Sequence, residues 1–202
     1  LEDNLLAYYT VDGKLNSMPF NSSTPLLYYN KDMFEEAGVE VPKSLEEMKI
    51  VGQKLKEAGV TDMPISFSVY GWWIDQFMNK QGLDLFDNEN GRKANPTKSV
   101  FEENGGVTNI LKAWKDLADE GIAPNVGKQG GTAEFNSGTS AMTFASTASL
   151  TQILSEVGDR FEVGTAYFPS VKDSDKNGVS IGGASLYAIN SGDEEKMAGT
   201  WD

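Results

Sequence analysis

The segment that indicates the fold is residues 18–30, M-P-F-N-S-S-T-P-L-L-Y-Y-N. Two prolines, Pro19 and Pro25, bracket the small polar residues Asn21–Thr24, and an apolar run follows. Residues 21–24 supply three side-chain hydroxyls and one side-chain amide. The whole sequence contains no His that could activate one of these hydroxyls as a nucleophile. Neutral hydrogen-bonding groups in this arrangement indicate binding in preference to covalent chemistry.

Two helices are predicted directly after this segment. Asn30 is a suitable cap for a short helix that Gly38 ends in a left-handed conformation. Ser44 and Glu47 have the spacing of a capping box, and the helix that they begin is expected to end at Gly59.

Strands and helices alternate along the rest of the chain. The apolar patterns predict strands at 65–69, 141–145, 161–168 and 180–189, and helices at 72–78, 109–118, 132–136 and after 146–149. Residues 87–98 are rich in Asn, Gly and charge, which predicts a loop or hairpin. Such alternation indicates α/β layering.

Composition excludes several classes of protein. The formal net charge of −13 argues against a nucleic-acid partner and against an anionic membrane surface. No apolar stretch approaches the roughly 20 residues of a membrane-spanning helix. The absence of Cys and His excludes thiolate chemistry, Cys-based zinc sites and a Ser-His-Asp triad, so we expect no metal and no cofactor.

The two ends of the sequence suggest a piece of a longer protein. The chain starts at Leu1 without Met, and it stops at Asp202 shortly after Ser191–Glu194, which has the spacing of a capping box. The 202 residues are enough for one large domain or two small ones.

Three clusters of small residues are candidate binding segments: Asn21–Thr24, Ala145–Ser149 and Ile181–Ser185. The second lies between a predicted strand and a predicted helix, so Ser146 or Thr147 either caps the helix or donates to a bound anion. Gly182-Gly183 either permits the close approach of a ligand or marks a bend in a strand.

Aromatic residues follow the predicted strand at 65–69. Tyr70, Trp72 and Trp73 could form a platform for a sugar or pack in the core, and we expect one Trp to be buried and the other to line a site. Asp75 is the carboxylate nearest to these rings, and we interpret it as a solvated helix residue. No spacing singles out the pair of carboxylates that a glycosidase needs.

These motifs together resemble the extracellular solute-binding proteins of ABC importers, in the maltose-binding-protein-like family 1 group. The resemblance rests on segments in one order along nearly the whole chain, and P-F-N-S-S-T-P with G-G-A-S-L is similar to the glycerol-phosphate branch of that family. The segments are Pro19–Pro25, Leu27–Phe34, Ala37-Gly38, Gly71–Ile74, Phe135–Gly138, Ala141–Ser149 and Ile181–Leu186.

The resemblance implies a two-lobed protein of about twice this length that closes on its ligand by a hinge. Residues 1–202 would form a single lobe, mainly the C-terminal one, of a periplasmic-binding-protein-like type II fold with a mixed sheet flanked by helices. The N-terminal lobe and the final C-terminal segment would be absent.

The resemblance also implies a set of ligand contacts. The matching positions are Ser23, Tyr70, Trp73, Ser146 and Gly183, and Ser22, Trp72 and Thr147 are further candidates. Trp73 would stack on the glycerol or sugar portion of the ligand. Tyr70 departs from the family pattern, which has Trp there, so the nature of the ligand stays open.

The implied function is the solute-binding component of an ABC importer that captures glycerol-3-phosphate or a glycerophosphodiester without chemical change. Its partners would be the permease subunits, and its location extracytoplasmic, either periplasmic or lipid-anchored at the cell surface. The alternatives are the same fold binding a neutral sugar or oligosaccharide, a hydrolase of such ligands, and a structural or interaction domain.

Overall fold

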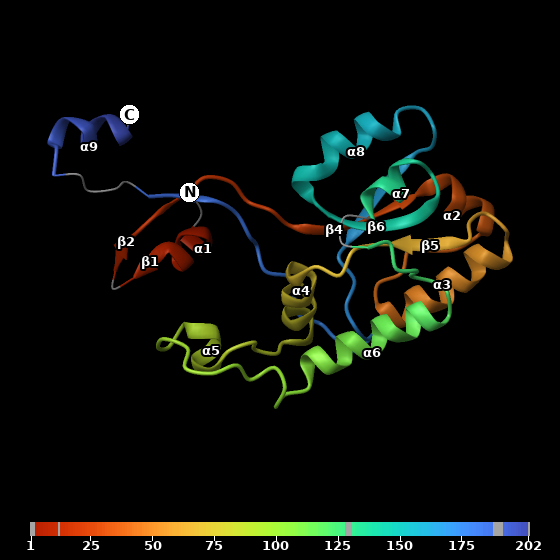
Figure 1. Cartoon of the computed structure of the whole chain (residues 1–202), viewed down its shortest axis with the longest axis horizontal. Coiled ribbons are helices and arrows are strands. Elements are labelled where there is room, and N and C mark those ends of the chain that lie inside the picture. The colour runs from red at the N-terminus through yellow and green to blue at the C-terminus, as the bar shows by residue number, and fades with distance from the viewer. Residues whose placement is uncertain (1–2, 12, 128–130, 188–191, 202) are drawn as a thin grey trace. The chain divides into compact units, whose positions relative to one another are not determined.

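The computed structural model describes residues 3–11, 13–127, 131–187 and 192–201. Its internal contacts divide the chain into two compact units (Figure 1). The first unit contains residues 1–23 and 181–202, and the second contains Thr24–Ser180.

A mixed sheet forms the centre of the second unit. Its strands are β4 (Pro25–Asn30), β5 (Met63–Ser66), β6 (Ser140–Ser146) and β7 (Val163–Tyr167), in the spatial order β5-β6-β4-β7. β5 runs parallel to β6, whereas β4 runs antiparallel to both of its neighbours, β6 and β7. The predicted α/β architecture with a mixed sheet is therefore confirmed.

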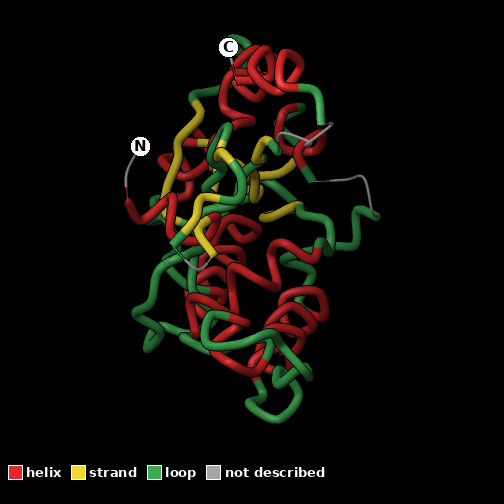
Figure 2. The backbone as a smooth tube through the Cα atoms, turned by 90° about the vertical axis from the view of Figure 1, so that its left-hand side faces the viewer, coloured by secondary structure: helices red, strands yellow, loops and turns green. Residues whose placement is uncertain are grey.

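Helices cover both faces of this sheet. One face packs against α3 (Leu45–Glu57), α4 (Gly71–Gln81) and α6 (Gly106–Asp119), and the other against α7 (Thr132–Asn136) and α8 (Leu150–Val157) (Figure 1). Figure 2 colours the helices red and the strands yellow in a view at 90° to that of Figure 1. The short α2 (Lys31–Ala37) follows β4, and the 3-10 helix η2 (Thr147–Ser149) joins β6 to α8.

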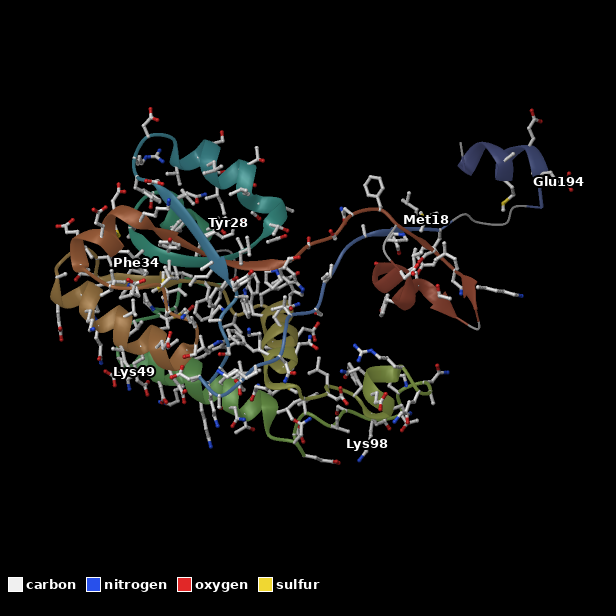
Figure 3. All side chains as sticks on the ribbon, turned by 180° about the vertical axis from the view of Figure 1, so that it is seen from behind. Met18, Tyr28, Phe34, Lys49, Lys98 and Glu194 are labelled. Atoms are coloured by element: carbon white, nitrogen blue, oxygen red, sulfur yellow. The ribbon has the colours of Figure 1, made fainter. Side chains whose placement is uncertain are left out.

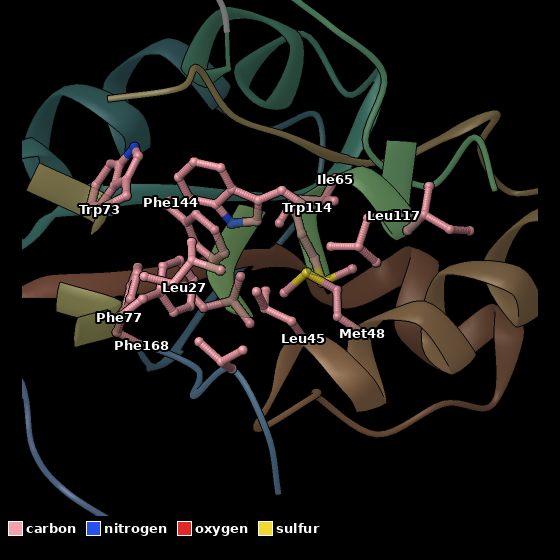
Figure 4. Packing of buried hydrophobic residues seen from close by; sticks show 14 of the residues in the cluster. Leu27, Leu45, Met48, Ile65, Trp73, Phe77, Trp114, Leu117, Phe144 and Phe168 are labelled. Atoms are coloured by element: carbon pink, nitrogen blue, oxygen red, sulfur yellow. The ribbon is translucent and has the colours of Figure 1, made fainter. Parts of the chain in front are cut away.

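The alternation of side chains along β4 divides the apolar core between the two faces. Leu27 belongs to the larger cluster with α3, α4 and α6, whereas the next residue, Tyr28, belongs to the smaller cluster with α7 and α8. Figure 4 shows the larger cluster, in which Phe77, Phe144 and Phe168 pack together. In the smaller cluster the Tyr28 hydroxyl donates to the carbonyl of Ser146 at 2.8 Å.

The predicted helix starts are confirmed. The side chain of Asn30 accepts a hydrogen bond from the N–H of Met33 at 3.1 Å, and Gly38 ends α2 with φ +63°. Ser44 caps α3 by accepting from the N–H of Glu47 at 3.0 Å. The reciprocal bond differs from that of a standard capping box, because the Glu47 carboxylate accepts from the N–H of Lys43 at 2.7 Å.

Side chains of α3 on the side away from the sheet reach solvent. Figure 3 shows Lys49 on this outer side, where it forms an ion pair of 2.9 Å with Glu120. Tyr28 and Phe34, also labelled in Figure 3, lie inside the unit and are 0% and 4% exposed.

Several predicted boundaries were wrong, and the largest differences concern three elements. The strand predicted at 65–69 is β5, Met63–Ser66, because Phe67 turns into the core and packs on Trp114 and Phe144. α6 begins at Gly106, three residues before the predicted start. Of the strand predicted at 180–189, only β8 (Ser185–Leu186) forms, and residues 188–189 lie outside the described part of the chain.

The loop or hairpin predicted at 87–98 is confirmed. Phe86 and Ser99 form an antiparallel bridge across its base, and the Asp87 carboxylate accepts from the N–H of Thr97 at 2.8 Å. Within it, α5 (Asp87–Gly91) is a left-handed turn, with φ of 55° to 56° at 88–90.

The first unit is built from short elements. They are α1 (Asp3–Leu6), the 3-10 helix η1 (Ala7–Tyr9), the antiparallel pair β1 (Thr10–Val11) and β2 (Lys14–Leu15), the antiparallel pair β3 (Met18–Pro19) and β8, and α9 (Glu194–Trp201). At the start of α9 the Asp193 carboxylate accepts from the N–H of Lys196 at 3.1 Å, while the predicted cap, Ser191, lies outside the described residues. None of the described helices is long and apolar enough to cross a membrane.

We predict that Phe77→Ala destabilises the chain by about 3–5 kcal/mol, because it leaves a cavity where a 0% exposed ring touches Phe144 and Phe168. Ile50→Ala, at a residue 57% exposed on α3, is the control and should cost about 0.5 kcal/mol. Urea unfolding measures both values, and equal costs would contradict the core described here.

Candidate functional site

The topology of the second unit brings several chain segments to one end of its sheet, here called the site edge, where strands begin or terminate. The parallel neighbours β5 and β6 both end there, and the pairing of Pro25 with Ser146 places the start of β4 at the same edge. The pairing of Leu26 with Tyr167 places the end of β7 there as well. In open α/β sheets ligands bind outside the carboxyl ends of the strands, so this edge is the candidate site.

Ser146, the last residue of β6, and Thr147, the first residue of η2, lie at this edge. The Ser146 hydroxyl oxygen accepts from the N–H of Ala148 at 3.0 Å, which confirms its interpretation as a helix cap. No described residue accepts the hydrogen of that hydroxyl, so Ser146 still has a donor to offer. Thr147 is tied to Thr24: its side-chain oxygen accepts from the N–H of Thr24 at 3.2 Å, and its own N–H donates to the Thr24 carbonyl at 2.8 Å.

Tyr70, Trp72 and Trp73 lie around the start of α4, which follows β5. Tyr70 is 57% exposed, Trp72 is half-buried and Trp73 is 6% exposed, so the expected burial of one Trp is confirmed, whereas the contact of the other with a ligand stays a prediction. The ring of Tyr70 meets that of Trp73 edge-on, with centroids 6.0 Å apart.

The stacking role predicted for Trp73 does not suit its surroundings. Phe168 stacks on its ring with centroids 5.7 Å apart and planes at 19°, and the ring of Trp72 lies 5.0 Å away. Figure 4 shows Trp73 at the margin of the aromatic cluster. Neighbouring rings surround Trp73, which is 6% exposed, so the more accessible rings are those of Tyr70 and Trp72.

The first turn of α4 supplies donors that the sequence analysis did not identify. The side chain of Tyr70 makes no capping bond, and the N–H groups of Gly71 and Trp72 have no acceptor among the described residues. A Cβ placed on Gly71 would meet nothing within 4 Å, so the backbone there is open. The sequence feature that could have indicated these unpaired N–H groups is a predicted helix start with no Ser, Thr, Asp or Asn at the cap position.

Asp75 lies one turn further along α4. Burial raises the pKa of its carboxyl group. Asp75 is therefore less solvated than its interpretation as a solvated helix residue implied, because its residue is only partly exposed.

Ser23 and Gly183 lie in the first unit. Ser23 pairs with Gly182, its N–H donating to the Gly182 carbonyl at 2.6 Å, with the reverse bond at 3.1 Å. A Cβ on Gly183 would lie 2.1 Å from the carbonyl oxygen of Asn21. The close approach at Gly183 is therefore to the backbone of Asn21 in the same unit, and Ser22, next to Asn21, is exposed.

The candidates thus fall into two groups. The second unit gathers Tyr70, Trp72, Trp73, Ser146 and Thr147 at one sheet edge, and the first unit holds the others. A cavity of about 890 Å³ in the second unit is lined by none of them. Among the described residues no cluster of three or more carboxylates could hold a metal ion.

Comparison with known proteins gives consistent results. Residues 1–202 match the family described as bacterial extracellular solute-binding protein. The sn-glycerol-3-phosphate-binding periplasmic protein UgpB of Escherichia coli (strain K12) is 35% identical over 93% of this chain, and that of Salmonella typhimurium is 35% identical over 95%. The chain spans 43% and 45% of the length of these two relatives.

Solved structures agree with the fold. UgpB from Mycobacterium tuberculosis in complex with glycerophosphocholine aligns with a TM-score of 0.75 and 25% identity, over 98% of this chain and 49% of that one. The GacH receptor of Streptomyces glaucescens, solved unliganded and with acarbose, aligns with a TM-score of 0.74 and 26% identity, over 96% and 49% of the two chains. The second unit therefore has the mixed α/β architecture of a type II periplasmic-binding-protein-like fold.

We predict that Gly183→Ala destabilises the pairing of residues 21–23 with residues 182–184 by about 1–3 kcal/mol, because the new Cβ must displace the Asn21 carbonyl. Hydrogen exchange at the N–H of Ser23 should accelerate. Gly178→Ala, where a Cβ meets nothing within 4 Å, is the control, and unchanged exchange in both variants would contradict the close approach.

We predict that Asp75→Asn stabilises the chain near neutral pH and has no effect well below the ordinary carboxyl pKa of about 3.9. Because burial raises the pKa of Asp75, the folded chain binds its proton more tightly than the unfolded chain, and stability falls as pH rises through the folded-state pKa. Urea midpoints at both pH values measure the effect. Asp62→Asn, at an exposed residue, is the control, and equal responses would contradict the prediction.

Proposed function

Because this chain belongs to the bacterial extracellular solute-binding protein family, we propose that it is part of the solute-binding component of an ABC importer. The proposed ligand is glycerol-3-phosphate or a glycerophosphodiester, which the protein captures and releases without chemical change. The observation that carries the proposal is the 35% identity, over 93% to 95% of this chain, to proteins named for binding sn-glycerol-3-phosphate.

The proposed protein has two lobes, and residues 1–202 supply mainly the C-terminal lobe. The coverage supports this division, since the chain spans 43% to 45% of its relatives. Thr24–Ser180 has a sheet with helices on both faces and a core of its own, as a lobe requires.

The proposed contacts in the second unit are uncharged. Ser146 donates its free hydroxyl hydrogen to a ligand oxygen, and the amides of Gly71 and Trp72 at the start of α4 are further donors. Tyr70 and Trp72 supply ring surface for the glycerol portion, and Trp73 supplies an edge and holds the other two rings in place.

In the first unit, Ser23 and the backbone of Gly183 are the proposed contacts, with Ser22 as a further candidate. Their support comes from the tight backbone pairing of Ser23 with Gly182, which holds this segment in a defined conformation. Thr147 is a weaker candidate, because its side-chain oxygen already accepts from Thr24.

A neutral sugar or oligosaccharide is the second candidate ligand. It is favoured by the GacH receptor, which was solved with acarbose, and by the exposed ring of Tyr70, since flat rings stack on the C–H faces of sugars. A hydrolase is disfavoured, because the proposed contacts are hydroxyls, rings and amides, whereas glycoside hydrolysis uses two facing carboxylates. We therefore propose no catalytic residue.

The proposed location is extracytoplasmic, since the relatives at 35% identity are named periplasmic proteins. A protein free in the periplasm and one anchored by lipid at the cell surface both fit this proposal. The proposed partners are the permease subunits of the importer, to which a binding protein delivers its solute.

Calorimetric titration of the full-length parent protein tests the ligand. We expect heat with glycerol-3-phosphate or glycerophosphocholine and none with maltose or raffinose, and the opposite result would replace the first ligand with the second. The 202-residue chain alone should bind weakly or undetectably, because one lobe supplies only part of the contacts. Submicromolar binding by this chain would show that the site is placed wrongly.

We predict that Tyr70→Ala and Ser146→Ala in the parent each weaken ligand binding about tenfold, since each removes one contact. Phe86→Ala, which truncates a ring 44% exposed at the base of the 87–98 loop, is the matched control and should leave the dissociation constant unchanged. If Tyr70→Ala and Ser146→Ala bind the ligand as tightly as the unsubstituted parent does, neither residue belongs to the site.

A further inference from the structure

The sequence contains three Asn-Gly pairs: Asn90-Gly91, Asn104-Gly105 and Asn177-Gly178. In such a pair the main-chain nitrogen of the Gly reaches the side-chain amide carbon of the Asn easily, because Gly has no Cβ to obstruct the approach. The attack closes a succinimide ring, so each pair is a candidate site of spontaneous covalent modification. The surroundings of the three pairs decide which of them reacts in the folded chain.

Hydrogen bonds hold the side chain of Asn90 at both of its polar atoms. Its Oδ1 accepts from the N–H of Leu85 at 2.8 Å and from that of Phe86 at 2.9 Å, and its Nδ2 donates to the Asp84 carboxylate at 2.7 Å. Asn90 and Gly91 are both half-buried. To approach the nitrogen of Gly91, the Asn90 amide would have to give up these hydrogen bonds.

The side chain of Asn104 is held in a similar way. Its Oδ1 accepts from the N–H of Gly106 at 3.0 Å, and its Nδ2 donates to the carbonyl of Asp84 at 2.7 Å. Asn104 and Gly105 are both half-buried. The fold therefore protects this pair as well.

Asn177 and Gly178 lack this protection. Both residues are exposed, and no hydrogen bond joins residues 177–179 to any part of the chain that the structure describes. A Cβ built on Gly178 would meet nothing within 4 Å, so the space around its main-chain nitrogen is open. The attacking nitrogen and the amide carbon are thus both free to move toward each other.

The chain on either side of residues 177–179 is anchored. Before them, the N–H of Asp175 donates to the carbonyl of Lys172 at 3.1 Å, and the Asp175 carboxylate accepts from the N–H of Lys172 at 2.9 Å. After them, Ser180 makes two hydrogen bonds of 2.9 Å with the side chain of Gln76, which is 0% exposed. The backbone can therefore rotate at residues 177–179 without disturbing the segments around them.

The Asn177 amide lies at the C-terminal end of α4. A Cβ built on Gly82, the residue that ends this helix, would lie 2.4 Å from Nδ2 of Asn177, so the missing side chain of Gly82 leaves room for the amide. The start of α4 lies at the site edge, and a helix of 11 residues is about 15 Å long. A change at Asn177 is therefore remote from the candidate ligand contacts.

We propose that Asn177 is the site of spontaneous deamidation in this chain. The main-chain nitrogen of Gly178 attacks Cγ of Asn177, the bond between Cγ and Nδ2 breaks, and the proton of the attacking N–H leaves with Nδ2 as ammonia. Water then opens the succinimide, giving aspartate by addition at the side-chain carbonyl and isoaspartate by addition at the main-chain carbonyl. The product carries one additional negative charge at the C-terminal end of α4, which is the negative end of the helix dipole.

Incubation of the folded 202-residue chain at mildly alkaline pH, where the attacking nitrogen loses its proton more readily, tests the site by peptide mapping with mass spectrometry. We expect Asn177 to convert at least about tenfold faster than Asn90 or Asn104, because those side chains must first break three and two hydrogen bonds. Equal rates at the three residues, a faster reaction at Asn90 or Asn104, or no reaction at Asn177 would overturn the proposal.

The same incubation in urea is the control for local sequence. Once the chain is unfolded the hydrogen bonds of Asn90 and Asn104 are lost, and the three residues should react at similar rates. A preference for Asn177 that persists in urea would show that its sequence neighbours select it, and would overturn the inference from the fold.

Two variants test the attacking atom. Gly178→Ala should slow the conversion of Asn177, because the new Cβ hinders the attack while the open space around residue 178 accommodates it. Gly199→Ala, at an exposed glycine whose new Cβ also meets nothing within 4 Å, is the matched control and should leave the rate unchanged. Conversion of Asn177 in Gly178→Ala at the rate of the unsubstituted chain would contradict the attack by this nitrogen.

Discussion

The antiparallel pairing of β4 between β6 and β7 is the constraint on which the rest of the second unit depends. Because side chains alternate along a strand, this one segment divides the apolar residues between two faces, Leu27 on one and Tyr28 on the other. A shift of one residue in the pairing would exchange the two faces and bury the wrong set. The helices on both faces therefore depend on the register of six residues.

The same pairing creates the candidate site. β4 enters the sheet at the edge where β5 and β6 end, so Thr24 meets Thr147 through two hydrogen bonds. Aromatic residues at the start of α4 and the free hydroxyl hydrogen of Ser146 are placed at that edge by backbone geometry. The groups at that end are neutral hydrogen-bond donors and aromatic rings. Such groups suit the binding and release of a ligand without chemical change.

A net charge of −13 does not conflict with the proposed phosphate-bearing ligand, because the candidate site would hold the phosphate with backbone N–H groups. Unpaired N–H groups at a helix start attract anions through their fixed dipoles and need no Lys or Arg.

Local signals in the sequence were enough for the helix starts at Asn30 and Ser44, the 87–98 hairpin, the α/β class and the family, because caps, turns and alternation depend on neighbouring residues. The burial of Trp73 against Phe168 and the close contact of Gly183 with Asn21 were decided by tertiary structure. Each of these depends on which distant segment a residue meets, and no local pattern encodes that. The end of β5 at Ser66 has the same origin, since Phe67 leaves the strand for rings more than 40 residues away in the chain.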